Sequence, residues 1–182
     1  MDDIVKAALK KWPNVPHVYG WLGLDARGDW YLRDEPTQAA GSFPQIKGSR
    51  ILHDKLREFI QRNYASDEAG SWFFQNGPQR VYVELEAAPW VWRLSQPDGE
   101  EVVVRSHTGH RAVVDSACVD DRGRLFLDTD FGFGIVHTQD MELASRMVER
   151  GAWEPVEARF DDLPQRHGYR LSPQAAAHSR AQ

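Results

Sequence analysis

The sequence is poor in cysteine and has no segment typical of secretion or membrane insertion. Its single cysteine, Cys118, excludes a disulfide within the chain and favours a reducing compartment. The N-terminal residues lack the basic start and the apolar stretch of a secretory signal. No stretch approaches the roughly 18 consecutive apolar residues of a membrane-spanning helix. We therefore expect a cytoplasmic protein that does not bind membranes.

An excess of basic residues is also missing. The 182 residues include 22 Lys and Arg against 27 Asp and Glu, which gives a formal net charge of -5. Proteins that bind long nucleic acids need a basic surface, so this class of partner is excluded. The charge still permits a nucleotide-like or other anionic small molecule that is held by one or two arginines.

The chain lacks a glycine-rich phosphate loop. The nearest candidate, residues 131–134, reads Phe-Gly-Phe-Gly, but the Lys and Ser/Thr that follow in a P-loop are missing. We interpret this segment as a hairpin bend, and we expect no cofactor.

The sequence does contain one turn motif three times. Asp-x-x-Gly followed by apolar strand residues occurs at 25–32, 67–74 and 120–127. Aspartate and glycine suit tight turns because their side chains and backbones accept turn geometry. The motif therefore predicts three turns that each lead into a strand, and it carries little information about chemistry.

Two of these turns align over a longer stretch. Residues 67–85 can be placed without a gap on 120–138, which lie 53 positions later. Either the two segments arose by duplication, or they are alike only because they share turn chemistry. In this register a partly polar strand face of the earlier segment becomes Phe133, Ile135 and His137. The later strand should therefore be covered on both sides, by the helix at 140–150 or a sheet edge, or by the other half or a ligand.

The pattern of apolar residues predicts an α+β fold. Helical spacing occurs over 2–12, 50–63 and 140–150, of which the last two are the main helices, with Ser49 as the expected N-cap of 50–63. Residues 34–48, rich in Pro and Gly, should form a loop. Antiparallel β-hairpins and the two main helices should make two related halves. The expected division is an N-terminal helix and first half over 1–88, a second half over 89–170, and a flexible tail over 171–182.

The main candidate for a ligand site is the hairpin over 71–86. Arg80 carries a planar fork that suits phosphate or carboxylate, and an aromatic ring can stack on a base. Arg80 and Tyr82 alternate onto one strand face, so they can act together. In the alternative interpretation the hairpin is an ordinary surface, with Arg80 paired to Glu84 or another acid. The predicted ligand-binding residues are Trp72, Asn76, Gln79, Arg80, Tyr82, Phe133 and His137.

A metal or thiol site is less well supported. His107 and His110 lie three residues apart, and His137 or an aspartate could add a third metal ligand. Cys118 lies among Val and Ala residues, where a thiol usually serves packing. We interpret the two histidines as part of a solvated loop, and we assign neither a metal ligand nor a catalytic residue.

A family resemblance adds to these patterns. Residues 72–83 read Trp-Phe-Phe-Gln-Asn-Gly-Pro-Gln-Arg-Val-Tyr-Val, which resembles the most distinctive signature of uncharacterised proteobacterial domain-of-unknown-function families. The resemblance extends over roughly residues 18–150. It implies a duplicated core whose C-terminal half is loosely like a pleckstrin-homology barrel. It also implies a ligand site between the halves and a role in signalling, and it transfers no catalytic residue.

Three functions remain open at this point. The first is a non-enzymatic module that binds a small ligand, or that signals, through a site between its halves. The second is a protein-interaction scaffold or homodimer, which the surplus of Trp favours. The third is a small metal-dependent hydrolase that uses His107 and His110.

Overall fold

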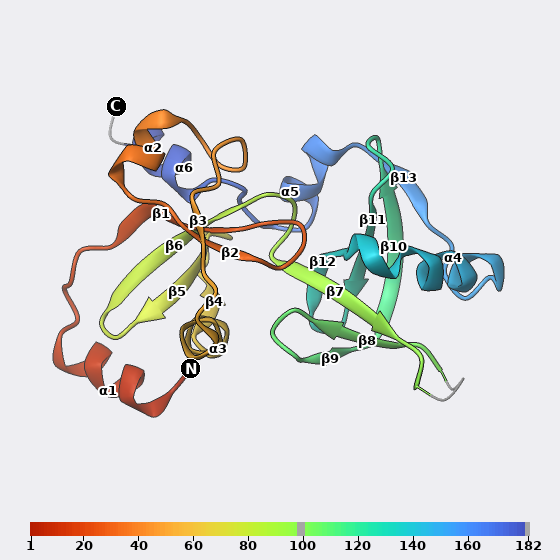
Figure 1. Ribbon diagram of the computed structural model, residues 1–182, viewed down its shortest axis with the longest axis horizontal. Coiled ribbons are helices and arrows are strands. Elements are labelled where there is room, and N and C mark those ends of the chain that lie inside the picture. The colour runs from red at the N-terminus through yellow and green to blue at the C-terminus, as the bar shows by residue number, and fades with distance from the viewer. Residues whose placement is uncertain (98–100, 181–182) are drawn as a thin grey trace. The chain divides into compact units, whose positions relative to one another are not determined.

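A computed structural model describes residues 1–97 and 101–180 of the chain (Figure 1). Contacts divide the chain into two compact units. Unit 1 comprises residues 1–25, 29–86 and the C-terminal segment from 168 onward, and unit 2 comprises 26–28 and 87–167. Each unit contains its own sheet and its own helices, so the predicted α+β class with two halves is confirmed.

Unit 1 is built on a six-stranded sheet with the order β3-β2-β1-β6-β5-β4. Neighbouring strands are antiparallel, except that β1 and β6 run parallel at the centre. The strands are β1 (Val18–Leu24), β2 (Trp30–Leu32), β3 (Ser49–Arg50), β4 (Tyr64–Ser66), β5 (Trp72–Asn76) and β6 (Gln79–Leu85). The helices of this unit are α1 (Asp3–Lys11), α2 (Glu35–Ala40), α3 (Asp54–Arg62) and α6 (Pro173–Arg180).

Unit 2 is built on a seven-stranded sheet with the order β13-β10-β11-β12-β7-β8-β9. Its parallel pairs are β7 with β12 and β10 with β13. The strands are β7 (Trp90–Ser95), β8 (Val103–Ser106), β9 (Arg111–Ala112), β10 (Val114–Asp120), β11 (Leu125–Thr129), β12 (Gly132–Val136) and β13 (Val156–Ala158). The helical segments are η2 (Thr138–Asp140), α4 (Met141–Glu149), η3 (Phe160–Asp162) and α5 (Leu163–Arg166).

The two sheets share one strand order. Strands β1 to β6 and strands β7 to β12 each form two three-stranded meanders, joined by a parallel pair between the first and the last strand. Cross-strand partners also coincide when 67–85 is placed 53 positions later, so the predicted register holds in the strand pairing. The matching pairs are Phe73–Tyr82 with Phe126–Ile135, and Tyr64–Phe74 with Ala117–Leu127.

The three Asp-x-x-Gly turns share one hydrogen-bond pattern. In each, an aspartate Oδ1 accepts from one or two backbone N–H groups of the same turn, and the glycine has a positive φ that residues with a Cβ rarely adopt. The bonds to Oδ1 come from Asp29 N (3.0 Å) at Asp25, from Ala69 N (3.0 Å) and Ser71 N (2.9 Å) at Asp67, and from Arg122 N (3.0 Å) and Arg124 N (2.8 Å) at Asp120. The turns predicted from the motif are confirmed.

The second carboxylate oxygen of each turn aspartate binds a side chain from outside the turn backbone. Tyr31 and Lys47 donate to Oδ2 of Asp25, at 3.2 and 3.1 Å. The hydroxyl of Tyr82 donates to Asp67 (3.0 Å), and Arg124 Nε donates to Asp120 (2.8 Å). Because both oxygens are hydrogen-bonded, these carboxylates can lie in protected positions without a large desolvation cost.

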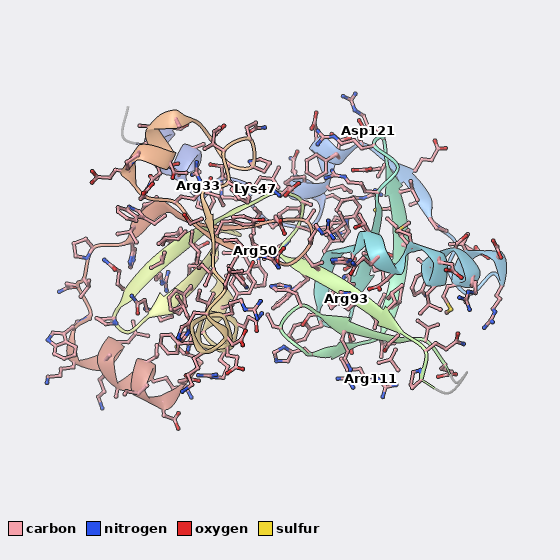
Figure 2. The ribbon with its side chains drawn as sticks, in the orientation of Figure 1. Arg33, Lys47, Arg50, Arg93, Arg111 and Asp121 are labelled. Atoms are coloured by element: carbon pink, nitrogen blue, oxygen red, sulfur yellow. The ribbon has the colours of Figure 1, made fainter. Side chains whose placement is uncertain are left out.

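A buried arginine fixes the segment after β2. Arg33 is 1% exposed, and Figure 2 shows its position in unit 1. Its guanidinium donates to three backbone carbonyls, those of Gly20 (3.2 Å), Gly41 (2.6 Å) and Ile46 (3.2 Å). Residues 34–48, expected to be a loop throughout, contain α2, because Asp34 caps that helix by accepting from Thr37 N (3.0 Å).

The main helix of unit 1 begins later than predicted. Residues 49–50, expected to cap and open a helix over 50–63, pair with β2 as the short strand β3. Helix α3 starts at residue 54, and the Nδ1 of His53, in place of Ser49, accepts from Leu56 N (3.3 Å). A non-local strand pairing therefore overrides the local helical pattern at this point.

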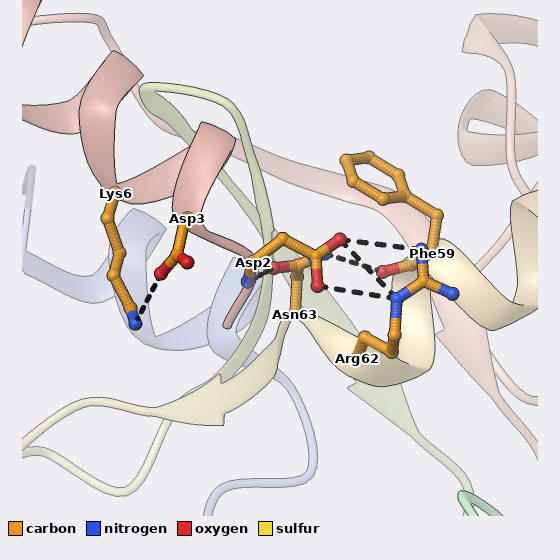
Figure 3. A network of polar contacts seen from close by, with 6 residues as sticks. All are labelled: Asp2, Asp3, Lys6, Phe59, Arg62 and Asn63. Atoms are coloured by element: carbon orange, nitrogen blue, oxygen red, sulfur yellow. Dashed lines mark hydrogen bonds and ion pairs between the residues drawn. The ribbon is translucent and has the colours of Figure 1, made fainter.

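A polar network ties α1 to the end of α3 (Figure 3). The Asp2 backbone N donates to Asn63 Oδ1 (2.8 Å), and the Asp2 carboxylate accepts from Arg62 Nε (3.3 Å). Asn63 also donates to the Phe59 carbonyl (2.9 Å), which caps the last turn of α3. Hydrogen bonds from Arg62 and Asn63 hold the pKa of Asp2 below its ordinary value.

The segment expected to be a flexible tail, residues 171–182, contains α6 as far as it is described. At the end of β6, Leu85 N donates to the Leu171 carbonyl (2.8 Å). The first turn of α6 meets the buried carboxylate of Glu84, whose Oε1 accepts from Gln174 N (3.0 Å). Among the described residues, no helix has the length and apolar character that crossing a bilayer requires.

The Asp120 turn offers a direct test of the shared turn chemistry. Asp120→Ala removes the carboxylate that accepts from two backbone N–H groups, and it leaves Arg124 without its ion-pair partner. We expect the free energy of unfolding to fall by roughly 2–4 kcal/mol, as for a broken, protected charge network. Chemical denaturation measures this change, with Asp115→Ala at an exposed position of the same strand as control. A loss no larger than that of the control would contradict this role.

Candidate functional site

The seven residues predicted to bind a ligand are divided between the units. Phe133 lies on β12 and His137 follows that strand, both in unit 2. The other five, which are Trp72, Asn76, Gln79, Arg80 and Tyr82, lie on the β5–β6 hairpin of unit 1.

The hairpin residues face opposite sides of the unit 1 sheet. Successive strand residues alternate between faces, so Gln79 and Arg80 point in opposite directions. Trp72 shares a face with Phe74, whose ring meets Phe59 of α3 edge-on at 5.4 Å between centroids. The pair Asn76–Gln79 lies on this α3-covered face as well, whereas Arg80 and Tyr82 lie on the other. The five residues therefore do not form one site.

The α3-covered face contains an apolar hollow of about 290 Å³. Its walls come from strands β1, β2, β5 and β6 and from α3, and Gln79 is fixed by donating to the Pro16 carbonyl (2.9 Å). Trp21 and Leu56 are 37% and 42% exposed, so parts of the wall are open to solvent. The lining residues are Val18, Trp21, Leu22, Leu32, Ile51, Leu56, Ile60, Phe74, Asn76, Gln79 and Val81.

This hollow follows from the amphipathic pattern of α3. Ile60 is buried on the sheet, while Leu56, one turn earlier, is only half covered. Leu52, expected on the same apolar stripe, precedes the helix and is 70% exposed. Since the helix starts at residue 54, its apolar stripe ends before it covers the sheet near Val18 and Leu32, and the hollow opens there.

On the opposite face of the hairpin, the side chains pack against other residues of the protein. Tyr82 is 4% exposed, and its ring stacks on Tyr19 with 4.6 Å between centroids. Burial, together with the nearby Asp67, raises the pKa of Tyr82. The guanidinium of Arg80 lies 4.4 Å from the centroid of the Phe73 ring, and Glu84, a partner considered for it, binds the backbone of α6.

Two other hollows are less suited to a small molecule. One in unit 1, beside Tyr82 and Arg170, measures about 70 Å³, which is room for only a few waters. One in unit 2 measures about 610 Å³, but charged residues of both signs line it. Among them, Asp121 accepts from Phe160 N (2.9 Å) and so serves the chain itself.

The predicted residues of unit 2 have structural contacts. The strand over 133–136 is buried at every position, as expected for a strand covered on both sides. Phe133 stacks between the rings of Phe126 (5.5 Å) and His167 (3.6 Å). His137 is buried, and its Nδ1 accepts from Gln139 N (3.0 Å) at the start of η2.

The residues considered for metal or thiol chemistry are separated. Among the residues that the structure describes, no group of three or more His, Cys, Asp or Glu could hold a metal ion. His110 stacks on Phe131 with 4.6 Å between centroids. Burial raises the pKa of Cys118, which disfavours the thiolate that a nucleophile requires.

His107 lies with His110 in the loop between β8 and β9, where it has a structural role. Its Nδ1 accepts from Val91 N (3.2 Å), and its Nε2 is buried. Desolvation, with a smaller contribution from His110, lowers the pKa of His107 to about 3. The imidazole therefore stays neutral at ordinary pH, because protonation would remove the acceptor that binds the backbone of β7.

Comparison with known proteins identifies the family of this chain. Residues 1–174 match the model of the DUF2944 family, described as "Protein of unknown function (DUF2946)". The chain belongs to that family. A comparison with the curated proteins finds no match. The resemblance to an uncharacterised domain-of-unknown-function family, expected from the sequence, is confirmed at that level.

Solved structures add a likeness in fold. A DUF1285 family protein from Silicibacter pomeroyi DSS-3 has a TM-score of 0.50 at 12% identity, over 81% of this chain and 85% of that one. A DUF1285 family protein from Shewanella baltica OS155 has a TM-score of 0.47 at 14% identity, over 69% and 91%. At such identity the first likeness concerns the fold alone.

The low pKa of His107 predicts a pH dependence of stability. The unfolded histidine gains its proton near pH 6.5 and the folded one only near 3, so between these values the unfolded state binds more protons. Stability therefore falls as the pH drops from 7 to 5, with roughly 1–2 kcal/mol of that fall due to this residue.

His107→Asn keeps an acceptor for Val91 N and removes the titrating group. Denaturation at pH 7 and pH 5 should show a smaller loss of stability in this variant than in the original protein. His53→Asn, at an exposed N-cap that Asn also suits, controls for the substitution itself. Equal losses in His107→Asn and the original protein would exclude the neutral buried histidine.

Proposed function

We propose that the protein is a non-enzymatic module that binds a small, largely apolar molecule in the hollow on the α3-covered face of unit 1. The observation that carries this proposal is the composition of its lining, which is aliphatic and aromatic with only Asn76 and Gln79 as polar groups. Its volume of about 290 Å³ is close to the lower end of known ligand sites. The proposed site lies entirely within unit 1.

The lining favours binding over catalysis. None of the residues that form the hollow is titratable, so they offer no general acid, general base or activated nucleophile. Two amide groups can orient an uncharged polar end of the ligand by hydrogen bonds. The apolar walls would supply most of the affinity through burial of the ligand's apolar surface.

We further propose that the two units descend from a duplication and that the second one keeps the pleckstrin-homology-like character implied by the resemblance. The shared strand order and the coincident partners 53 positions apart support the duplication. A signalling role follows if occupation of the hollow changes how the surface of unit 1 meets a partner. The same hollow would then be the place where the signal is received.

The proposed site can be tested with a neutral apolar fluorophore such as N-phenyl-1-naphthylamine. We expect saturable binding with an increase in fluorescence. Leu56→Glu should weaken it at least about tenfold, because a charge at the wall must lose water when the probe binds. Leu and Glu have similar helix propensities, so α3 should persist in the variant.

Leu52→Glu is the matched control. Leu52 is 70% exposed and does not line the hollow, so its variant should bind the probe as the original protein does. Circular dichroism verifies that both variants fold. Absence of saturable binding, or equal weakening by the two substitutions, would refute the site.

A further inference from the structure

Three arginines lie side by side across the edge of the unit 2 sheet. Arg93 of β7 pairs in register with Arg105 of β8, and Arg105 pairs with Arg111 of β9. Residues directly opposite in antiparallel strands share a face, and all three are exposed. Figure 2 labels Arg93 and Arg111 on these strands. We refer to Arg93, Arg105 and Arg111 as the arginine ladder.

Such an arrangement costs stability in the free protein. Side chains directly opposite across antiparallel strands have Cβ atoms about 4.5–5.5 Å apart, and a pair of like charges at such positions is destabilising. The protein has more acidic than basic residues, with a net charge of -5, so the three arginines lie together in spite of the overall composition. Because the repulsion does not stabilise the fold, the arginine ladder suggests a role in binding.

Among the residues that the structure describes, one arginine of the ladder pairs with a carboxylate. Arg93 donates to both oxygens of Asp140, from Nε at 2.6 Å and from a terminal nitrogen at 3.2 Å. Burial would raise the pKa of Asp140, but the hydrogen bonds from Arg93 and from Leu94 N hold it below its ordinary value. This pair is a fixed, bidentate contact that anchors the first rung.

Arg105 and Arg111 differ from Arg93 in their contacts. Arg105 donates to the Gly109 carbonyl at 3.4 Å, a long contact with a neutral group. Within the described ranges 1–97 and 101–179, no carboxylate forms an ion pair with Arg105 or Arg111. Two adjacent guanidinium forks thus face solvent on one side of the sheet.

We propose that Arg105 and Arg111 bind the phosphate group of a small phosphorylated molecule. A carboxylate has two oxygens, and the Arg93–Asp140 pair shows that a single fork occupies both. Two neighbouring forks therefore suit an anion with more acceptors, and a phosphate monoester offers three oxygens around one centre. The net negative charge of the protein argues against a long nucleic acid as the partner. This proposal is independent of the apolar hollow in unit 1.

The test uses phenyl phosphate as the probe, with benzoate as the carboxylate counterpart at matched ionic strength. Isothermal titration should show saturable binding of phenyl phosphate that is at least tenfold tighter than that of benzoate. Arg105→Gln and Arg111→Gln should each weaken phenyl phosphate binding at least tenfold. Arg105→Lys keeps the charge without the fork and should lie between. Arg146→Gln, which removes an exposed arginine paired with Glu142 in the same unit, should bind as the original protein does.

A second readout separates this role from a purely structural one. Without phosphate, Arg105→Gln and Arg111→Gln should raise the thermal midpoint, because each relieves the repulsion within the ladder. Both variants should lose the further rise that phenyl phosphate gives the original protein. The proposal is overturned if phenyl phosphate does not bind saturably, or if binding survives both substitutions. Binding of an acidic peptide but not of phenyl phosphate would likewise overturn it and assign the ladder to an acidic protein.

Discussion

The bound carboxylate at each Asp-x-x-Gly turn is the interaction on which the two sheets depend. One oxygen orders the backbone of the turn, and the other binds a side chain, which is Tyr82 of β6 at Asp67 and Arg124, next to the turn, at Asp120. Strand register follows from the turn, and a slip of one residue would move every side chain to the opposite face. In β6 such a slip would exchange the apolar Val81 and Val83 with Arg80 and Tyr82. The apolar hollow of unit 1 depends on this register of β6, which the hydrogen bond from the Tyr82 hydroxyl to Asp67 helps to hold.

Register also explains the arginine ladder of unit 2. Arg93 and Arg105 become neighbours only because β7 and β8 pair with this offset, and β9 then places Arg111 beside Arg105. The alternate residues on the same strands are buried, as Leu94, Val104 and Ala112 show. The strand pairing that gives unit 2 its apolar interior therefore also gathers positive charge on the solvent side. One of these charges is balanced by Asp140, whose own position is set by the turn after β12.

The sequence predicted what is local and missed what joins distant segments. The turns, the hairpins and the offset of 53 positions depend on residues close in the chain, and they agree with the strand pairing. The parallel pairs β1–β6 and β7–β12 bring together strands far apart, and no local pattern indicates them. Pairing between distant segments also explains why α3 starts later than predicted, because Ser49 pairs with β2 as part of β3. The predicted ligand set grouped Asn76 and Gln79 with Arg80 because they cluster around one hairpin in the sequence, although the strand pairing places them on opposite faces.

The two sheets show how one turn can keep its geometry while its surroundings change. Asp67 and Asp120 occupy equivalent positions, and each needs a donor for its second carboxylate oxygen. In unit 1 this donor is the hydroxyl of Tyr82, whereas the equivalent position in unit 2 is Ile135, which has no donor. There Arg124, next to the turn itself, takes over and also lies against an aromatic ring. Both carboxylates therefore keep a donor for the second oxygen, and in unit 2 the position equivalent to Tyr82 is apolar. In unit 2 this face of β12 carries the buried stack of Phe126, Phe133 and His167, whereas the apolar hollow of unit 1 lies on the opposite, α3-covered face and depends on where α3 begins.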